Sequence, residues 1–371
     1  MLTPHPKPLA AGARIRVLVV DDSASVRSLM TRALGEDPAL QVVGTASNGA
    51  IGLARTAELD PHVITLDIEM PEMDGLSMLR RVREQFPDVV VIMSSSLTAP
   101  GATATLDALL LGANDYITKP SHAQSPEHSI ALLRAELLPK IKQFFQAAEP
   151  ERVVAAVAGP RAAAAALSRR ATGRKVVAIG VSTGGPNALA AILPGLPVPF
   201  PCPVLIVQHM PPLFTRLLAE RLQRLTRLPV EEATQGCAVE AGKVLIAPGG
   251  SHMRVQTSEH GTLVSLDQSP PRNSCRPSVD VLFESVNEVY GSSAIAAVLT
   301  GMGQDGLRGV ERLKASGAYI IAQNEASSVV WGMPGYVVRA GLADAVVPLE
   351  GIVPEMLHEL HSGLRRIGAG R

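Results

Sequence analysis

Aromatic side chains, an excess of charge of either sign and long apolar runs are all scarce or missing in this sequence of 371 residues. Phe, Tyr and Trp number 6, 4 and 1, fewer than expected for a protein that stacks single-stranded bases. The 34 basic and 34 acidic residues cancel, which argues against a dedicated nucleic-acid binder with a basic surface. No apolar run approaches the length of a membrane-spanning helix, and the N-terminus lacks the apolar segment of a signal peptide. These absences predict a soluble, cytoplasmic protein.

Cysteine is also scarce. Cys202, Cys237 and Cys275 are widely spread and form no C-x-x-C pair. An odd number without such a pair speaks against both a disulfide framework and a structural zinc site. The expectation is that all three are free thiols without a chemical role, in a reducing compartment.

What the first part of the chain does have is an alternation of short Val- and Ile-rich runs with segments of helical apolar spacing. The expected strands are 14–20, 41–46, 62–67, 89–93 and 115–118, and the expected helices are 24–34, 48–59, 76–85, 102–111 and 129–145. Strands that alternate with helices indicate right-handed βαβ units and a parallel sheet. Residues 12–146 are therefore expected to form a (βα)5 domain of the flavodoxin-like type, with strand order 2-1-3-4-5.

Composition changes after this domain. Residues 147–173 are rich in Ala, Arg, Gly and Pro and lack the branched and aromatic residues of a core, so they are interpreted as a linker. A second alternation follows, with strands expected at 175–179, 203–208, 243–247, 262–266, 293–299 and 318–322, and helices at 187–193, 213–225, 279–290 and 307–316. Residues 174–365 are thus expected to be a second α/β domain, doubly wound and mostly parallel.

Three carboxylates are expected to converge in the first domain. Asp21 and Asp22 end the first strand, and Asp67 ends the third, which lies beside the first in the expected order. Adjacent carboxylates repel one another, so a divalent cation is implied, and Mg²⁺ suits oxygen ligands. Ser94 follows the fourth strand and Lys119 the fifth. This set fits the formation of an acyl phosphate on Asp67, with Mg²⁺, Lys119 and Ser94 holding the phosphoryl oxygens.

These residues occur in the segments Val19-Val20-Asp21-Asp22-Ser23, Asp67–Gly75 and Tyr116-Ile117-Thr118-Lys119-Pro120. Over residues 14 to 145 the sequence resembles the response-regulator receiver family. The resemblance implies that a partner histidine kinase phosphorylates Asp67. It also implies that Ser94 and Tyr116 reorient on phosphorylation and so report the change across the domain.

A glycine-rich turn, Gly180-Val181-Ser182-Thr183-Gly184-Gly185-Pro186, joins an expected strand to an expected helix in the second half. The pattern G-x-S-x-G matches the turn that presents a serine nucleophile in hydrolases. Taken alone it leaves three interpretations open: helix capping by Ser182, phosphate binding at a helix N-terminus, and catalysis.

Two further strand ends favour catalysis. His209 follows the strand 203–208, and Asp305 lies in a glycine-rich loop after the strand 293–299. Strand ends that bring Ser, His and Asp to one sheet edge give the arrangement that a catalytic triad requires, with His209 as base and Asp305 orienting it. The α/β-hydrolases have the chain order Ser, acid, His, which would require His252, His260, His358 or His361 here. None of these ends a clear buried strand, so the order Ser182, His209, Asp305 is preferred.

The second half resembles the catalytic domain of the chemotaxis protein-glutamate methylesterases. The matching segments are 180–186, 207–211, 247–253, 276–280, 299–306, 324–328 and 332–335. The resemblance implies catalytic roles for Ser182, His209 and Asp305, with Thr183 and the Met302 backbone N–H beside the oxyanion. Val181 and Tyr336 depart from the family pattern and bear on substrate preference.

The combined resemblance implies an enzyme under phosphorylation control that demethylates γ-glutamyl methyl esters on the cytoplasmic helices of chemoreceptors and deamidates certain receptor glutamines. Mg²⁺ is expected in the receiver only, with no cofactor for the ester hydrolysis. The simplest control is steric, with the unphosphorylated receiver covering the Ser182 cleft. Two rival hypotheses are a non-enzymatic response regulator, disfavoured by the charge balance, and a general small-ester hydrolase.

Overall fold

A computed structural model describes residues 6–7, 9–10, 12–96, 98–119, 125–145 and 175–368, with side chains as far as 361. The predicted linker 147–173 and Pro120 lie outside the described residues. Contacts divide the chain into two units, Met1–Glu149 and Pro150–Arg371, each of which is described by itself. Within the described part, no helix is long and apolar enough to cross a membrane.

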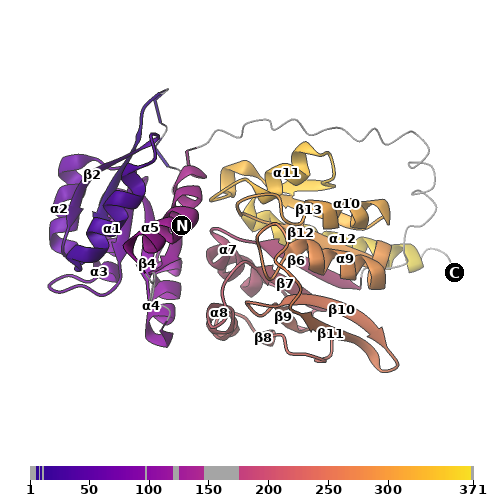
Figure 1. Cartoon of the computed structure of the whole chain (residues 1–371). Helices are drawn as coiled ribbons and strands as arrows, with labels where there is room; N and C mark the ends of the chain where they lie inside the picture. The colour runs from indigo at the N-terminus through magenta and orange to yellow at the C-terminus, as the bar shows by residue number, and fades with distance from the viewer. Residues whose placement is uncertain are drawn as a thin grey trace. The chain divides into compact units, whose positions relative to one another are not determined.

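The first unit is a five-stranded parallel sheet in the order β2-β1-β3-β4-β5, which confirms the predicted order. Figure 1 labels β2 and β4 of this sheet and the five helices α1 to α5. Its strands are β1 Ile15–Val20, β2 Leu40–Ala46, β3 Val63–Asp67, β4 Val90–Ser95 and β5 Asp115–Thr118. Its helices are α1 Ala24–Gly35, α2 Gly49–Leu59, α3 Gly75–Gln85, α4 Ala99–Leu110 and α5 Pro126–Lys142. Each of the strands β3 and β4 is buried along its whole length, as expected for a parallel sheet covered on both faces.

Local sequence explains where these five helices begin. Each has a short polar side chain at its N-cap that accepts a hydrogen bond from a backbone N–H in the first turn. The five caps are Ser23, Asn48, Asp74, Thr98 and Ser125. A cap of this kind stabilises a helix by about 1 kcal/mol, because it satisfies an N–H that has no partner within the helix.

The second unit contains a seven-stranded parallel sheet in the order β14-β13-β12-β6-β7-β9-β8 and a separate antiparallel pair, β10-β11. The strands are β6 Val176–Val181, β7 Val204–Gln208, β8 Val230–Glu232, β9 Val244–Ile246, β10 His252–Ser258, β11 Gly261–Asp267, β12 Ala294–Val298, β13 Tyr319–Gln323 and β14 Ala345–Val347. The helices are α7 Gly185–Ile192, α8 Phe214–Gln223, α9 Val279–Tyr290, α10 Leu307–Ala315, α11 Met333–Arg339 and α12 Ile352–Gly368. The predicted fold class is therefore confirmed for both units.

Both faces of the seven-stranded sheet are buried. Val176, Ala178 and Leu205 pack with helix α9 in one core cluster, while Val177 and Ile206 point to the other face and are equally buried. Successive side chains of a strand point to opposite faces, so burial of both sets requires helices on both sides. The strand ends that carry the candidate triad belong to β6, β7 and β12, which are neighbours in the middle of this sheet.

Candidate active site

Ser182 and His209 stand side by side because their strands are neighbours in register. Val181 at the end of β6 pairs with Gln208 at the end of β7, and each candidate residue is the next one along its strand. The His209 backbone N–H donates to the Val181 carbonyl at 3.3 Å, and that of Ser182 donates to the Thr300 carbonyl at 3.0 Å. Thr300 follows β12. The strands β12, β6 and β7 therefore hold together the first residues of the loops that carry Asp305, Ser182 and His209.

The turn that carries Ser182 does not use its hydroxyl as a helix cap. The N-cap of α7 is Gly184, with φ of 77° and no side-chain cap. Gln208 is buried, and its Nε2 donates to the Ser182 carbonyl at 3.0 Å. A Cβ on Gly185 would lie 1.9 Å from Gln208 Oε1, so glycine is required there. The hydroxyl thus has no structural role as the cap of this helix, which removes one of the three interpretations of the motif.

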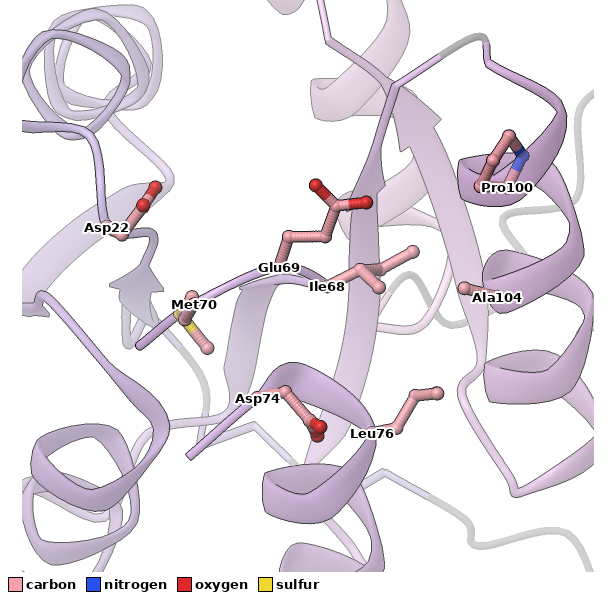
Figure 2. Close-up of a pocket in the computed structure, with 8 residues that line it drawn as sticks. All are labelled: Asp22, Ile68, Glu69, Met70, Asp74, Leu76, Pro100 and Ala104. Carbon is pink, nitrogen blue, oxygen red and sulfur yellow. The ribbon is translucent and has the colours of Figure 1, made fainter. Parts of the chain in front are cut away.

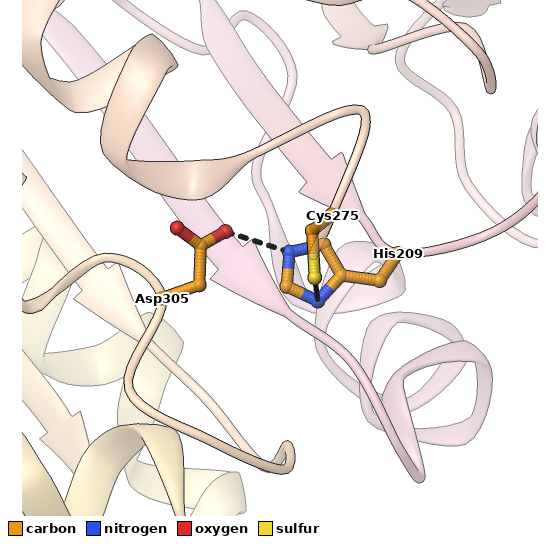
Figure 3. A group of neighbouring side chains, drawn as sticks. All are labelled: His209, Cys275 and Asp305. Atoms are coloured by element: carbon orange, nitrogen blue, oxygen red, sulfur yellow. Dashed lines mark hydrogen bonds and ion pairs between the residues drawn. The ribbon is translucent and has the colours of Figure 1, made fainter. Parts of the chain in front are cut away.

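His209 and Asp305 form a hydrogen-bonded pair, with 2.8 Å between Nε2 and Oδ2 (Figure 3). Both side chains are largely withdrawn from solvent, with relative exposures of 12% and 3%. Burial by itself lowers the pKa of His209, but the hydrogen bonds to Asp305 and Cys275 raise it to about 10. Asp305 thus engages Nε2, and Nδ1 is the ring nitrogen that the carboxylate does not contact.

Asp305 accepts hydrogen bonds from several further groups. Oδ1 accepts from Asn273 Nδ2 and Ser278 Oγ, both at 2.8 Å, and Oδ2 accepts from the Val279 N–H at 2.6 Å. Burial raises the pKa of Asp305, yet the bonds from His209, Asn273 and Ser278 lower it to about 2. Ser278 precedes α9 without capping it, so the carboxylate of a distant loop satisfies the helix N-terminus instead. Asp305 is thereby held ionised and in one orientation.

Cys275 also contacts His209, contrary to the expectation that the three cysteines have no chemical role. Its Sγ lies 3.6 Å from His209 Nδ1 (Figure 3). All three cysteines are free thiols; Cys202 is buried, and Cys237 and Cys275 are half-buried. The sequence interpretation missed Cys275 and Asn273, although they lie one and three positions before the matching segment that begins at Arg276.

Hydrogen bonds fix the loop after β12 at Gly301, the residue before Met302. The Gly301 carbonyl accepts from the N–H groups of Gly332 and Met333 at 3.1 and 2.8 Å. A Cβ on Gly301 would lie 2.8 Å from Ser182 Cβ, so this loop lies directly against the candidate nucleophile. Met302 itself is 40% exposed, and Thr183 is largely buried. Of the two predicted oxyanion residues, Thr183 directly follows Ser182 in the chain, and Met302 follows Gly301 in the loop that packs against Ser182.

None of the four alternative histidines meets Asp305. His252 is buried, and its Nδ1 accepts from the Ser278 N–H at 3.2 Å, while Nε2 lies 3.2 Å from the Pro270 carbonyl. His260, His358 and His361 are exposed. The α/β-hydrolase order that these residues would require is therefore not the arrangement of this sheet.

The three carboxylates predicted in the first unit do converge. One oxygen from each of Asp21, Asp22 and Asp67 lies within 4.8 Å of the others. Lys119 Nζ lies 3.0 Å from Asp21 Oδ2 and 2.8 Å from Asp67 Oδ2. Burial raises the pKa of Asp67, an effect that Asp21 strengthens and Lys119 opposes. A cluster of three carboxylates supplies the oxygen ligands that Mg²⁺ prefers, so these residues fit that ion.

Ser94 and Tyr116 differ in detail from the prediction. Ser94 lies within β4, opposite Asp67 in the register, rather than beyond the strand end. Tyr116 lies on β5 and is 6% exposed, with Lys140 Nζ 4.8 Å from its ring centroid. Ser94 therefore faces the acidic cluster from the neighbouring strand, and Tyr116 is in its buried orientation.

A pocket of about 570 Å³ adjoins the acidic cluster (Figure 2). It is lined by Asp22, Ile68, Glu69, Met70, Asp74, Leu76, Pro100 and Ala104. A smaller pocket of about 190 Å³ contains Asp67, Ser94 and Lys119 themselves. The candidate phosphoacceptor is thus reached through an acidic opening of the first unit.

Comparison with known proteins covers both units. Residues 177–356 match the family described as CheB methylesterase, and residues 17–130 match the response regulator receiver domain. A protein-glutamate methylesterase/protein-glutamine glutaminase of Trichodesmium erythraeum is 44% identical over 354 residues, covering 94% of this chain and 99% of that protein. A protein of the same name from Nocardioides sp. is 47% identical over 354 residues, covering 93% and 95%.

Solved structures match the units separately. The Thermotoga maritima CheB methylesterase catalytic domain is 43% identical with a TM-score of 0.49, covering 50% of this chain and 98% of that one. The response regulator domain of Thermotoga maritima CheB is also 43% identical, with a TM-score of 0.32, covering 35% and 95%. The whole-length relatives show that the similarity extends across both units.

Proposed function

Because the chain belongs to the CheB methylesterase family and carries that family's receiver domain, we propose that it hydrolyses γ-glutamyl methyl esters through Ser182, His209 and Asp305. The observation that carries this proposal is that the three residues lie in the loops that follow the adjacent central strands β6, β7 and β12, with Asp305 bound to one ring nitrogen of His209. The substrates are methylated glutamates on chemoreceptor helices, and the reaction takes place in the cytoplasm.

The reaction begins when Ser182 Oγ attacks the γ-carbonyl carbon while its proton passes to His209 Nδ1. Asp305 holds the Nε2–H and stabilises the imidazolium. Backbone N–H groups of Thr183 and Met302 stabilise the oxyanion. The bond to the methoxy oxygen then breaks, and the leaving group takes the proton from Nδ1 and departs as methanol.

Water completes the cycle by the same proton route. His209 Nδ1 removes a proton from water, which attacks the acyl carbon of the Ser182 ester and releases a free glutamate side chain. When the substrate is a glutamine, the group that leaves in the first step is ammonia, and the second step is unchanged. One site therefore performs both the esterase and the deamidase reaction.

Phosphorylation of Asp67 by a histidine kinase controls this activity. Asp21, Asp22 and Asp67 would hold Mg²⁺, which supplies charge neutralisation for the transferring phosphoryl group. Lys119 is placed to pair with a phosphoryl oxygen in place of the Asp67 oxygen that it now contacts. Ser94, opposite Asp67, can donate its hydroxyl to the same group.

The decisive experiment measures methanol release from a panel of methylated receptors, with and without a small-molecule phosphodonor. Ser182→Ala is the matched control, since the hydroxyl does not cap α7. A parallel assay with a nitrophenyl ester distinguishes a general esterase, and labelling of Ser182 by an organophosphonate distinguishes a non-enzymatic regulator. Turnover of the nitrophenyl ester without methanol release from any receptor would contradict the proposal.

A further inference from the structure

His209 Nδ1 and Cys275 Sγ lie 3.6 Å apart in the candidate active site. Zinc binds cysteine sulfur at about 2.3 Å and histidine nitrogen at about 2.0–2.1 Å, and at a tetrahedral angle these bonds place the two ligand atoms about 3.6 Å apart. The two atoms are hydrogen-bonded to each other in this structure, and the same separation is that of two ligands on one zinc ion.

The second ring nitrogen of His209, Nε2, also has the kind of partner found in metal sites. A ligating histidine usually donates its other ring N–H to a carboxylate, which fixes the ring and leaves a lone pair on the ligating nitrogen. Asp305 accepts from Nε2 at 2.8 Å and has this role here. Asp305 lies across the ring from Nδ1, so it orients the ligand rather than completing the coordination.

The cysteine is held by a tight turn. The N–H of Arg272 donates to the Cys275 carbonyl at 3.0 Å, and that of Cys275 donates back at 2.9 Å. Between them Asn273 and Ser274 have φ of 49° and 62°, which is the conformation of a type I′ turn. Arg272 forms a bidentate ion pair with buried Glu284 of α9, and Asn273 bonds to Asp305. The turn that carries the sulfur is therefore anchored to the residue that orients the histidine.

The geometry points to an inhibitory Zn²⁺ site formed by Cys275 Sγ and His209 Nδ1, with water completing the coordination and the protons of the thiol and of Nδ1 released to solvent. Cys275 is half-buried and the His209 side chain is 12% exposed, so a small cation can enter from solvent. Zinc on Nδ1 occupies the lone pair that must accept the Ser182 proton, so hydrolysis stops while the cation is bound. The inhibitory effect rests on the proposed function, but the binding itself does not.

Binding is tested on the full-length protein with Co²⁺ as a spectroscopic probe and Mg²⁺ in excess to occupy the acidic cluster of the first unit. A thiolate-to-cobalt absorption band is expected in the wild type, and Zn²⁺ should abolish it by competition. Cys275→Ser and His209→Ala should each lose the band. Cys237→Ser, which removes another half-buried thiol of the same unit, should keep it. Absence of the band in the wild type, or its persistence in Cys275→Ser, would overturn the proposal.

Inhibition is tested by titrating Zn²⁺ in the methanol-release assay, with each variant normalised to its own rate without zinc. The midpoint for Cys275→Ser should rise at least tenfold over the wild type, and that for Cys237→Ser should not move. Equal midpoints for Cys275→Ser and the wild type would refute the site. If no variant releases methanol, the function proposal fails, while the cobalt band still decides whether the metal site exists.

Discussion

Nε2 of His209 lies 2.8 Å from Oδ2 of Asp305, so Nδ1, and not Nε2, is the ring nitrogen that is not engaged by the carboxylate. A carboxylate bound in this way fixes the tautomer and stabilises the imidazolium that forms during acyl transfer. The contact joins the loops after β7 and β12, on either side of the strand that carries Ser182.

Removal of a triad residue should abolish turnover without unfolding the protein. Ser182→Ala and His209→Ala are each expected to lower kcat for methanol release by roughly 10⁴-fold or more, because the two act as one unit. The double variant should lose little beyond either single one. Thermal unfolding of Ser182→Ala should match the wild type, and wild-type turnover in His209→Ala would refute the assignment of the base.

Activity should increase with pH. The pKa of His209 is raised to about 10, and only neutral Nδ1 can accept the Ser182 proton, so the active fraction grows as protons are removed. Well below that pKa, kcat/KM is expected to rise about tenfold per pH unit, measured between about pH 6 and 9 with correction for spontaneous ester hydrolysis. A profile that is flat or falls with pH over this range would contradict the raised pKa.

A methyl group on Gly301 should disable the site. The added Cβ would lie 2.8 Å from Ser182 Cβ and 2.5 Å from Met333 Sδ, so Gly301→Ala must displace the nucleophile or the loop. We expect at least a hundredfold loss in kcat/KM, in line with the cost of small misplacements in a catalytic site. Gly195→Ala is the matched control, since its Cβ would meet no atom closer than 3.7 Å. Equal activity of the two variants would show that the approach at Gly301 is unimportant.

Activation of methanol release by a phosphodonor should depend on the carboxylate cluster of the first unit, while the basal rate should not. Asp67→Asn is expected to abolish activation by a phosphodonor and to leave basal methanol release intact, because Asp67 lies in the other unit from Ser182. Chelation of Mg²⁺ should have the same effect as Asp67→Asn on the intact chain. Loss of basal turnover in a fragment of the second unit on chelation would contradict the restriction of Mg²⁺ to the first.

A fragment that begins near Gly173 should be more active than the unphosphorylated intact chain. The receiver and the catalytic unit each have their own sheet and core, so the second unit is expected to fold when separated. Initial rates of methanol release from the fragment and the intact protein test whether the receiver restrains the enzyme. Equal rates, together with no phosphodonor response, would rule out inhibition by the receiver.

Much of the fold could be predicted because most core strands are continuous apolar runs and all five helices of the first unit start at polar caps. The three-residue strand β9 could be predicted because it lies in the apolar run 244–247. The equally short strands β8 and β14 were missed, because 230–232 reads Val-Glu-Glu and 345–347 lies between Asp344 and Pro348. Strand β10 and helix α11 were also missed, and β10 pairs with β11 outside the main sheet. The apolar pattern of one segment does not reveal which other segment it pairs with, or that the pair lies outside the main sheet.

The triad residues could be proposed from sequence because each follows an expected strand, and parallel strands end at one edge. Cys275 and Asn273 could not, since they lie on a turn whose position depends on contacts with α9 and Asp305. The hydrogen bond from the first N–H of α9 to Asp305 could not be predicted either. A helix cap is normally expected in the residue just before the helix, and Asp305 lies far from it in the sequence.

The place of β12, β6 and β7 in the middle of the seven-stranded sheet bears on how the enzyme responds to partial unfolding. Amide hydrogen exchange begins where few neighbours protect the backbone, which here means the short edge strands β8 and β14. The amides of the three central strands exchange only in the more extensive openings. Fraying of the sheet edges can therefore proceed while the strands that hold the catalytic loops together remain paired.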